Sequence, residues 1–261
     1  MGTVPLLLRL REEGALPALS DRLGQGVRTN SEALLGVVST DPEVDLSEGI
    51  AITSILHTDD HSHIEPCRYS KGSGFWRTLL TPHGHGDTAP ARLLGILRSF
   101  ATEPLQQLRA ATVRDFGKQS QVLLYMRSLD GSLTMKLGRN AFTGFRRGLT
   151  TELDDPRVAP KAYMPEATEL AQRFASKVQG VVLSLFTEAL LGTPSTAHIL
   201  GGCCMGESAE TGTIDLQHRL FGYDGLYVID GSAVSANPGV NPSLTITALA
   251  ERACTFFAPK S

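Results

Sequence analysis

The chain has 261 residues, of which 41% are hydrophobic and 20% are charged, and its formal net charge at pH 7 is −3. These values lie in the range of globular proteins, and the length permits one large domain or two small ones. The charge gives no support for a nucleic-acid partner or an anionic membrane partner, and no apolar run reaches membrane-spanning length.

The first part of the chain carries signals for one helix and two strands. Leucines at positions 6, 7 and 10 share one face of a helix expected over residues 4–13, and Gly14 is suited to ending it. Alternation with β-branched residues predicts a strand over residues 48–56. Residues 63–70 are expected to form the next strand.

The middle of the chain predicts helices and one hairpin. Residues 91–108 favour a helix with a break near Pro104, because proline cannot continue a helix without losing a hydrogen bond. Two apolar-rich segments within residues 121–138 flank Asp130-Gly131, which is a favoured two-residue hairpin turn. Residues 166–178 have the pattern of an amphipathic helix.

The last third combines a connector, a strand and a helix. Residues 154–165 are rich in proline and read as a connector. Residues 225–232 form a short, nearly all-apolar run that is typical of a strand buried on both faces. Residues 242–257 predict a helix that starts with proline in its first turn. The fold class that follows is α+β, with a substantial antiparallel part.

The cysteines give no disulfide framework. Four of them, Cys67, Cys203, Cys204 and Cys254, are too few for a disulfide scaffold, and adjacent cysteines rarely satisfy disulfide geometry. We interpret all four as free thiols, which favours a reducing compartment. The apolar run near the start lacks the cleavage site of a signal peptide. A cytoplasmic location is the expectation.

Histidine and carboxylate side chains are densest between residues 57 and 65. Imidazoles and carboxylates at such spacing can bind zinc or iron, which would suit a metal-dependent hydrolase. The simpler interpretation is a polar turn between two strands, because Thr58, Asp59 and Asp60 are turn formers and no recognised metal motif fits. We favour the turn and expect no metal. The cluster consists of His57, Asp59, Asp60, His61, His63 and Glu65.

Residues 84–89, with the sequence GHGDTA, match the G-x-G-x-x-A dinucleotide pattern in letters only. A dinucleotide-binding turn follows a hydrophobic strand directly, whereas Thr81, Pro82 and His83 precede this one. Asp87 would also place a carboxylate where a pyrophosphate should lie. We interpret the segment as a surface loop.

Two segments near the C-terminus suggest chemistry. In residues 225–257 a strand ends at Asp230-Gly231-Ser232, and Asn241 is positioned to cap the following helix, whose N-terminus offers unpaired N–H groups to an anion or a carbonyl. In residues 196–208, TAHILGGCCMGES, one histidine precedes two glycines and two cysteines. Those residues fit a metal site, a redox pair, a catalytic acid or base, or a plain turn.

These segments carry a resemblance. The stretch YVIDGSAVSANPGVNPSLTITALAERA, residues 227–253, resembles the C-terminal signature of the glucose–methanol–choline (GMC) flavoprotein oxidoreductases, and residues 196–206 resemble the catalytic-histidine segment of its cholesterol oxidase-like branch. VRTNSEALLG, residues 27–36, and HIEPCRYSKGS, residues 63–73, resemble further segments of the bacterial branch. The resemblance covers nearly the whole chain. The family's N-terminal FAD-binding motif has no counterpart in this sequence.

The resemblance implies a function and a cofactor. It implies the C-terminal portion of a flavin-dependent sterol oxidase that binds FAD, converts a 3β-hydroxysteroid or another hydrophobic alcohol to a ketone, and passes electrons to oxygen. His198 would be the catalytic histidine, Asn241 would hydrogen-bond the substrate oxygen, and Glu65 is the candidate base for a Δ5 to Δ4 isomerisation. The residues implied in cofactor binding are Asp230, Gly231, Ser232, Gly239, Asn241, Pro242, Ser243 and Leu244.

The implied domain organisation has three parts. Residues 1–30 would be a remnant of the FAD domain, residues 31–195 an antiparallel substrate-binding domain with flanking helices, and residues 196–261 the catalytic segment with the C-terminal strand and helix of a Rossmann-like FAD domain. Without the dinucleotide motif, the isolated chain is expected to be inactive. The alternatives are the metal-dependent hydrolase and a non-catalytic remnant that binds neither cofactor nor sterol.

Overall fold

The computed structural model describes residues 2–129 and 131–257, and its chain divides into two compact units. Unit 1 contains residues 1–30, 128–159 and 197–261; unit 2 contains residues 31–127 and 160–196. The chain passes from one unit to the other after residue 30 and after residue 196. These positions are close to the boundaries expected at residues 30 and 195. Residues 128–159 lie with unit 1 instead of continuing the segment 31–195. The functional labels of these segments remain predictions.

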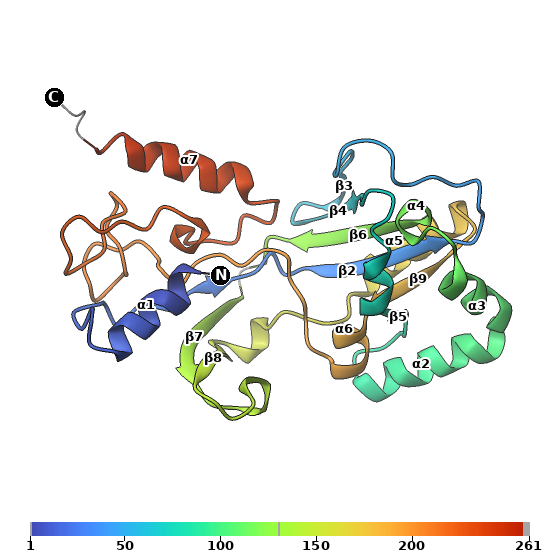
Figure 1. Ribbon diagram of the computed structural model, residues 1–261, viewed down its shortest axis with the longest axis horizontal. Coiled ribbons are helices and arrows are strands. Elements are labelled where there is room, and N and C mark those ends of the chain that lie inside the picture. The colour runs from blue at the N-terminus through green and yellow to red at the C-terminus, as the bar shows by residue number, and fades with distance from the viewer. Residues whose placement is uncertain (1, 130, 258–261) are drawn as a thin grey trace. The chain divides into compact units, whose positions relative to one another are not determined.

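Unit 2 is built on one antiparallel sheet of six strands in the order β3-β4-β6-β2-β9-β5 (Figure 1). Its elements are β2 (Ala33–Ser39), β3 (Leu56–Asp59), β4 (Ser62–Cys67), η1 (Gly74–Leu79), β5 (Leu80–Pro82), α2 (Ala89–Thr102), α3 (Pro104–Thr112), α4 (Phe116–Gln119), β6 (Ser120–Arg127), α5 (Pro165–Lys177), β9 (Gly180–Leu185) and α6 (Phe186–Leu191).

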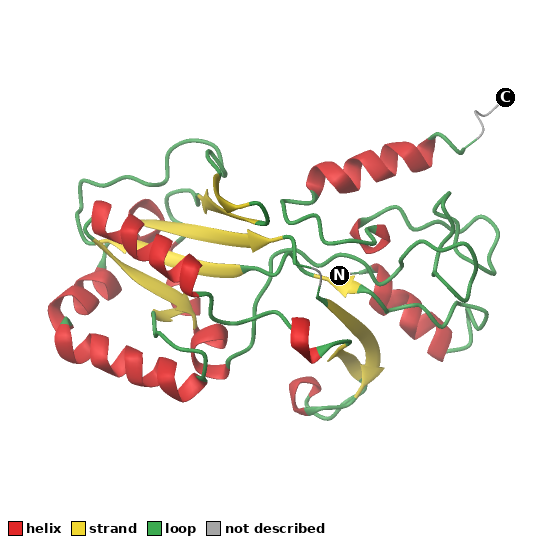
Figure 2. Ribbon diagram, turned by 180° about the vertical axis from the view of Figure 1, so that it is seen from behind, coloured by secondary structure: helices red, strands yellow, loops and turns green. Residues whose placement is uncertain are grey.

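Both faces of the central strands in this sheet are covered (Figure 2). Leu35 and Val37 of β2 pack with Ala171 of α5 on one face, whereas Val38 packs with Ala110 of α3 and Phe116 of α4 on the other. Side chains of a strand alternate between faces, so a strand buried on both sides must be apolar throughout. The continuous apolar run of β2 meets that requirement.

Unit 1 contains a smaller antiparallel sheet of three strands in the order β1-β7-β8. Its core joins α1 to β7 and to the C-terminal segment through buried side chains such as Leu8, Met135 and Ile214. Its elements are α1 (Thr3–Glu12), β1 (Val27–Arg28), β7 (Ser132–Gly138), η2 (Ala141–Thr143), β8 (Gly148–Leu153), η3 (Pro156–Val158), η4 (Gly231–Ala233) and α7 (Ser243–Cys254).

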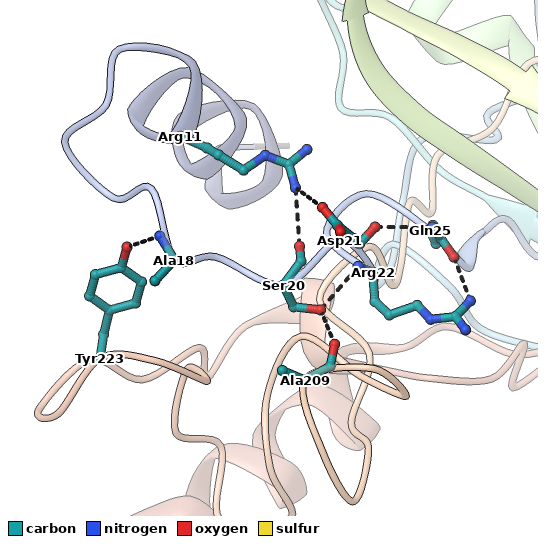
Figure 3. Close-up of polar contacts among 8 residues, drawn as sticks. All are labelled: Arg11, Ala18, Ser20, Asp21, Arg22, Gln25, Ala209 and Tyr223. Carbon is teal, nitrogen blue, oxygen red and sulfur yellow. Dashed lines mark hydrogen bonds and ion pairs between the residues drawn. The ribbon is translucent and has the colours of Figure 1, made fainter.

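The irregular segment after α1 is fixed by polar contacts to the C-terminal part of unit 1 (Figure 3). The hydroxyl of Tyr223 accepts a hydrogen bond from the Ala18 amide at 2.7 Å. The Ser20 hydroxyl donates to the carbonyl of Ala209 and accepts from the Arg22 amide at 3.0 Å. These contacts give residues 18–22 a defined course without regular secondary structure.

Several expectations for helices and turns are confirmed. The expected helices at residues 4–13 and 166–178 correspond to α1 and α5, and the break near Pro104 separates α2 from α3. A turn joins β3 to β4, as expected, but it is formed by residues 60 and 61, because Thr58 and Asp59 belong to β3. Residues 83–88 form a loop between β5 and α2. The antiparallel character is confirmed, because all seven strand pairings in the described residues are antiparallel.

Two strand predictions in the first half of the chain are wrong. Residues 48–55 form no strand; β3 begins only at Leu56. The expected hairpin over residues 121–138 is also absent, because β6 pairs with β2 and β4 whereas β7 pairs with β1 and β8. The two strands belong to different sheets, so non-local pairing overrides the local turn signal. Asp130 itself lies outside the described residues.

The prediction of a buried strand at residues 225–232 is also wrong. Tyr227 makes one isolated bridge with Arg219, and residues 230–233 turn into η4. Val228 is buried, but Leu226 is 41% exposed. The apolar run therefore contributes one core side chain, Val228, to unit 1 and forms no continuous series of strand hydrogen bonds.

In the described part of the chain, every helix is too short or too polar to cross a membrane. The four cysteines are free thiols, as expected.

A close backbone approach explains the two glycines at positions 201 and 202. Both have positive φ, +77° and +90°. A Cβ on Gly201 would lie 2.2 Å from the carbonyl oxygen of Gly26, and one on Gly202 would lie 2.7 Å from a methyl group of Val4. Since only glycine adopts this backbone without a steric penalty, the turn needs glycine for packing within unit 1.

Gly201→Ala is therefore expected to destabilise the protein more than Gly14→Ala. Gly14 has nearly the same φ, +75°, but no atom lies within 4 Å of the position that a methyl group would occupy there. The positive φ costs each variant about 1 kcal/mol, and the clash with Gly26 adds roughly 1–3 kcal/mol to Gly201→Ala. Thermal melting measures the difference, and equal melting temperatures would contradict the close approach.

Candidate functional site

A cavity of about 240 Å³ lies within unit 1. Its wall is formed by residues 2–5 at the start of α1, by Ile199 and Gly201, by residues 230–232, and by Ile246 of α7 with Met135 of β7. Segments from both ends of the sequence thus share one cavity, and the residue after His198 lies in its wall.

The polar side of the cavity is organised around Asp230. Its carboxylate caps η4 by accepting from the Ser232 amide at 2.8 Å, and it also accepts from the hydroxyls of Thr3 and Ser232. Burial acts to raise the pKa of Asp230, but the hydrogen bonds from Ser232 and Thr3 outweigh burial, so the pKa lies below its ordinary value. The cavity therefore holds a carboxylate at neutral pH.

The start of α1 gives the cavity N–H donors, whose partial positive charge is opposite to the negative charge of Asp230. The N-cap residue Gly2 has no side-chain capping bond. The first N–H groups of a helix have no partner within the helix and carry a partial positive charge. Val4, Ile199 and Ile246 add apolar surface to the same wall.

The expected flavin fits this wall in part. Hydroxyl, amide and carboxylate groups suit the polyhydroxylated chain of a flavin, and the aliphatic side chains suit its flat ring. Gly231 suits the close packing of this wall, because a Cβ at this position would approach Ile246 to 3.2 Å and Leu200 to 3.3 Å. The residues that would hold the cofactor here are Thr3, Asp230, Gly231 and Ser232.

The remaining residues expected to bind cofactor do not line this cavity. They are Gly239, Asn241, Pro242, Ser243 and Leu244. Leu244 is 81% exposed. The helix begins at Ser243 with Pro242 as its N-cap, so the expectation that Asn241 caps it is wrong.

The loop before α7 is tightly constrained. Asn30 donates to the Val240 carbonyl at 2.8 Å, and Asn237 accepts from the Gly239 amide at 2.8 Å. Gly239 has a φ of +64°, and a Cβ there would lie 2.8 Å from that of Ser128. These contacts fix the backbone that leads into Asn241.

His198 and Asn241 belong to unit 1, and both are half-buried. His198 lies between Ala197 and Ile199, in the segment that leads to the backbone bridge of Leu200 with Arg28. Its neighbour Ile199 is the residue that reaches the cavity.

Glu65 belongs to unit 2, where it lies on β4 and is 5% exposed. Its Oε1 atom lies 3.4 Å from Nε2 of His63. It is opposite Leu124 of β6, on the face of the sheet that α5 does not cover. Burial lowers the pKa of His63, against the smaller effect of Glu65, so the imidazole is neutral at pH 7.

Only part of the alternative metal site is brought together. His57 and His63 face each other across the β3–β4 pair with ring centroids 5.7 Å apart, and Asp59 accepts from the His61 amide in the turn. Among residues 2–129 and 131–257, no group of three histidine, cysteine or acidic side chains could hold a metal ion.

Of the two adjacent cysteines, Cys203 has an apolar environment. Cys203 is fully buried in the core of unit 1, and burial raises the pKa of its thiol to about 12. A thiol with this pKa is inert at neutral pH. Cys203 therefore serves as a core side chain.

Sequence reasoning missed most of the cavity wall, including Thr3, Val4, Ile199 and Ile246. The only available signal was Gly2-Thr3 in front of a leucine-rich helix. Nothing in the local sequence indicates that this helix start meets residues 230–232, since the contact is formed by tertiary structure.

Comparisons with known proteins give a consistent result. A family model described as GMC oxidoreductase matches residues 118–250. The chain is 40% identical over 260 residues to a cholesterol oxidase from Acinetobacter baumannii, covering 100% of this chain and 46% of the relative. It is 39% identical over 267 residues to a cholesterol oxidase from Mycobacterium tuberculosis, covering 99% of this chain and 45% of the relative.

A solved structure, pyridoxine 4-oxidase from Mesorbium loti, is similar with a TM-score of 0.40 and 14% identity, over 91% of this chain and 44% of that one. The chain spans about half the length of the curated relatives it matches. The family model covers about half of the chain and includes Asp230, Asn241 and the segment around His198. This chain belongs to the GMC oxidoreductase family.

Proposed function

We propose that the chain forms the C-terminal portion of an FAD-dependent sterol oxidase, which oxidises a 3β-hydroxysteroid to a ketone with oxygen as electron acceptor. The observation that supports this most directly is the unit 1 cavity, where Ile199, next to His198, lies in one wall with Asp230, Gly231 and Ser232. The two relatives named cholesterol oxidases are similar along the whole chain, which supports the substrate class.

The residues of unit 1 suit the oxidation of an alcohol. When bound, the flavin supplies the acceptor for the hydride that leaves the carbinol carbon. His198 takes the hydroxyl proton, because an alcohol is a very weak acid and needs a positioned base when its hydride leaves. Asn241 donates a hydrogen bond from its side-chain amide to the same oxygen.

Helix N-termini provide the positive electrostatic contribution. The start of α1 lies in the cavity wall, and α7 begins at Ser243 without a side-chain cap. A helix N-terminus stabilises negative charge by its free N–H groups. We assign to residues 239–244 the contact with the flavin ring, and to residues 230–232 the contact with its ribityl chain.

Glu65 is proposed as the base that moves a proton during the shift of the sterol double bond. It is a buried carboxyl group with a neutral imidazole, that of His63, beside it. A buried carboxylate near an apolar substrate can take a proton from one ring carbon and return it to another.

His198→Gln is expected to reduce turnover about a hundred- to ten-thousand-fold, because the general base is lost. Steady-state kinetics with cholesterol measure this in a longer chain, in which an FAD-binding portion precedes these residues, and sterol affinity should change far less. His85→Gln is the matched control, because His85 is exposed and belongs to unit 2. Near wild-type turnover of His198→Gln would overturn the assignment.

Glu65→Gln is expected to leave oxidation intact and to block isomerisation. Glutamine keeps the shape of the side chain and removes the base. Product analysis should then show the unshifted 5-en-3-one accumulating, while the exposed control Glu169→Gln yields the 4-en-3-one. If Glu65→Gln forms the 4-en-3-one at the normal rate, the base is another group.

Residues 1–261, produced as a separate polypeptide, are expected to purify without FAD and to leave sterols unoxidised. The 240 Å³ cavity can contact only part of a flavin, and the described residues offer no glycine-rich turn for the pyrophosphate. The visible absorbance of the protein after gel filtration decides this. A monomer with one flavin per chain would disprove the prediction.

A further inference from the structure

Two buried carboxyl groups of unit 2 hold the chain segment that immediately precedes His198. The Thr196 hydroxyl donates to Oε1 of Glu32 at 2.6 Å. The Ser195 amide donates to Oε1 of Glu188 at 3.1 Å. Glu32 is 1% exposed and directly precedes β2, and Glu188 is 3% exposed on α6.

Burying two carboxyl groups at one place opposes folding unless their hydrogen bonds are satisfied. Burial is the main cause that raises the pKa of Glu188, to about 8, and nearby Glu32 acts in the same direction. Arg92 is the buried cation of this region, and it donates to the carbonyls of Ala189 and Gly86, both at 3.0 Å. An apolar pair would fill the same space at lower cost, which indicates a role beyond packing.

The position of these contacts in the sequence suggests that role. Thr196 is the second residue before His198, and Leu200 is the second residue after it. Within unit 1, Leu200 is bonded to Arg28 in both directions, with N···O distances of 2.8 and 2.9 Å. His198 is thus the middle residue of a short span whose two ends are each held by a partner from residues 28–32.

From this geometry we propose that Glu32 is a positioning residue for the chain segment that leads into His198, acting through the hydroxyl of Thr196. Glu188 provides a second anchor at the Ser195 amide. The consequence for turnover rests on the proposed function of His198, whereas the anchoring itself does not. Catalytic groups lose efficiency steeply when they move by even 1 Å, so a loosened span lowers turnover although no catalytic group is removed.

The test compares Thr196→Val, which removes the hydroxyl donor at similar shape, with Thr196→Ser, which keeps it. Thr196→Val is expected to lower turnover about ten- to a hundred-fold at unchanged KM, and Thr196→Ser to remain near wild type. Glu32→Gln keeps an acceptor oxygen and should retain most activity, whereas Glu32→Ala should not. The double variant Glu32→Ala/Thr196→Val should be no slower than the slower single variant, because one interaction is lost in both.

Hydrogen exchange provides a readout that needs no cofactor and no activity. In Thr196→Val the backbone amides of residues 195–200 should exchange about ten-fold faster, while those of β6 keep their protection. Uniformly faster exchange, including β6, would mean a general loss of stability and would overturn the positioning role.

The two possible failures are distinguishable. Unchanged exchange in Thr196→Val overturns the anchoring, whatever the function of His198. Local loosening with normal turnover, while His198→Gln is inactive, overturns the positioning role and leaves the proposed function intact. Normal turnover of His198→Gln removes the proposed function, and with it the catalytic purpose of the anchor.

Discussion

Residues 200–203 are the constraint on which unit 1 depends, because they form backbone hydrogen bonds on both sides. On one side, Leu200 and Gly202 are bonded to residues 28 and 24. On the other, the amides of Gly201 and Cys203 donate to the carbonyls of residues 231 and 232, at 3.0 and 2.9 Å. The segment thereby joins the N-terminal part of unit 1 to η4, and the wall of the cavity follows from this arrangement.

The same constraint explains the unusual composition of the segment. A chain with neighbours on both sides has little room for side chains. Gly201 lies so close to the carbonyl of Gly26 that a methyl group would not fit between them, and Cys203 fills a fully buried position. The paired glycines therefore reflect packing of the protein against itself, and the resemblance to a flavoprotein family alone would not have shown this.

Local patterns predicted what depends on local physics. The 3.6-residue periodicity of α5 and the proline between α2 and α3 were sufficient to predict these helices, because the hydrogen bonds of a helix form within its own segment. Strand partners were not predictable: β6 and β7 flank a good hairpin turn, yet each pairs with strands far away in the sequence. His198 was proposed from resemblance, whereas Thr3 and Ile246 enter the site only through tertiary contacts.

The interrupted course of unit 1 has a consequence for biosynthesis. Every residue of unit 2 has been made once the ribosome passes Thr196, but unit 1 still lacks residues 197–257. At about 5–20 residues per second, this leaves a delay on the order of several seconds. During that time the side chains of Val4, Leu7 and Leu8 lack some of the partners that later bury them, since residues 214, 220 and 228 are made after all of unit 2. The nascent chain therefore leaves the apolar face of α1 incompletely covered until these later residues have emerged.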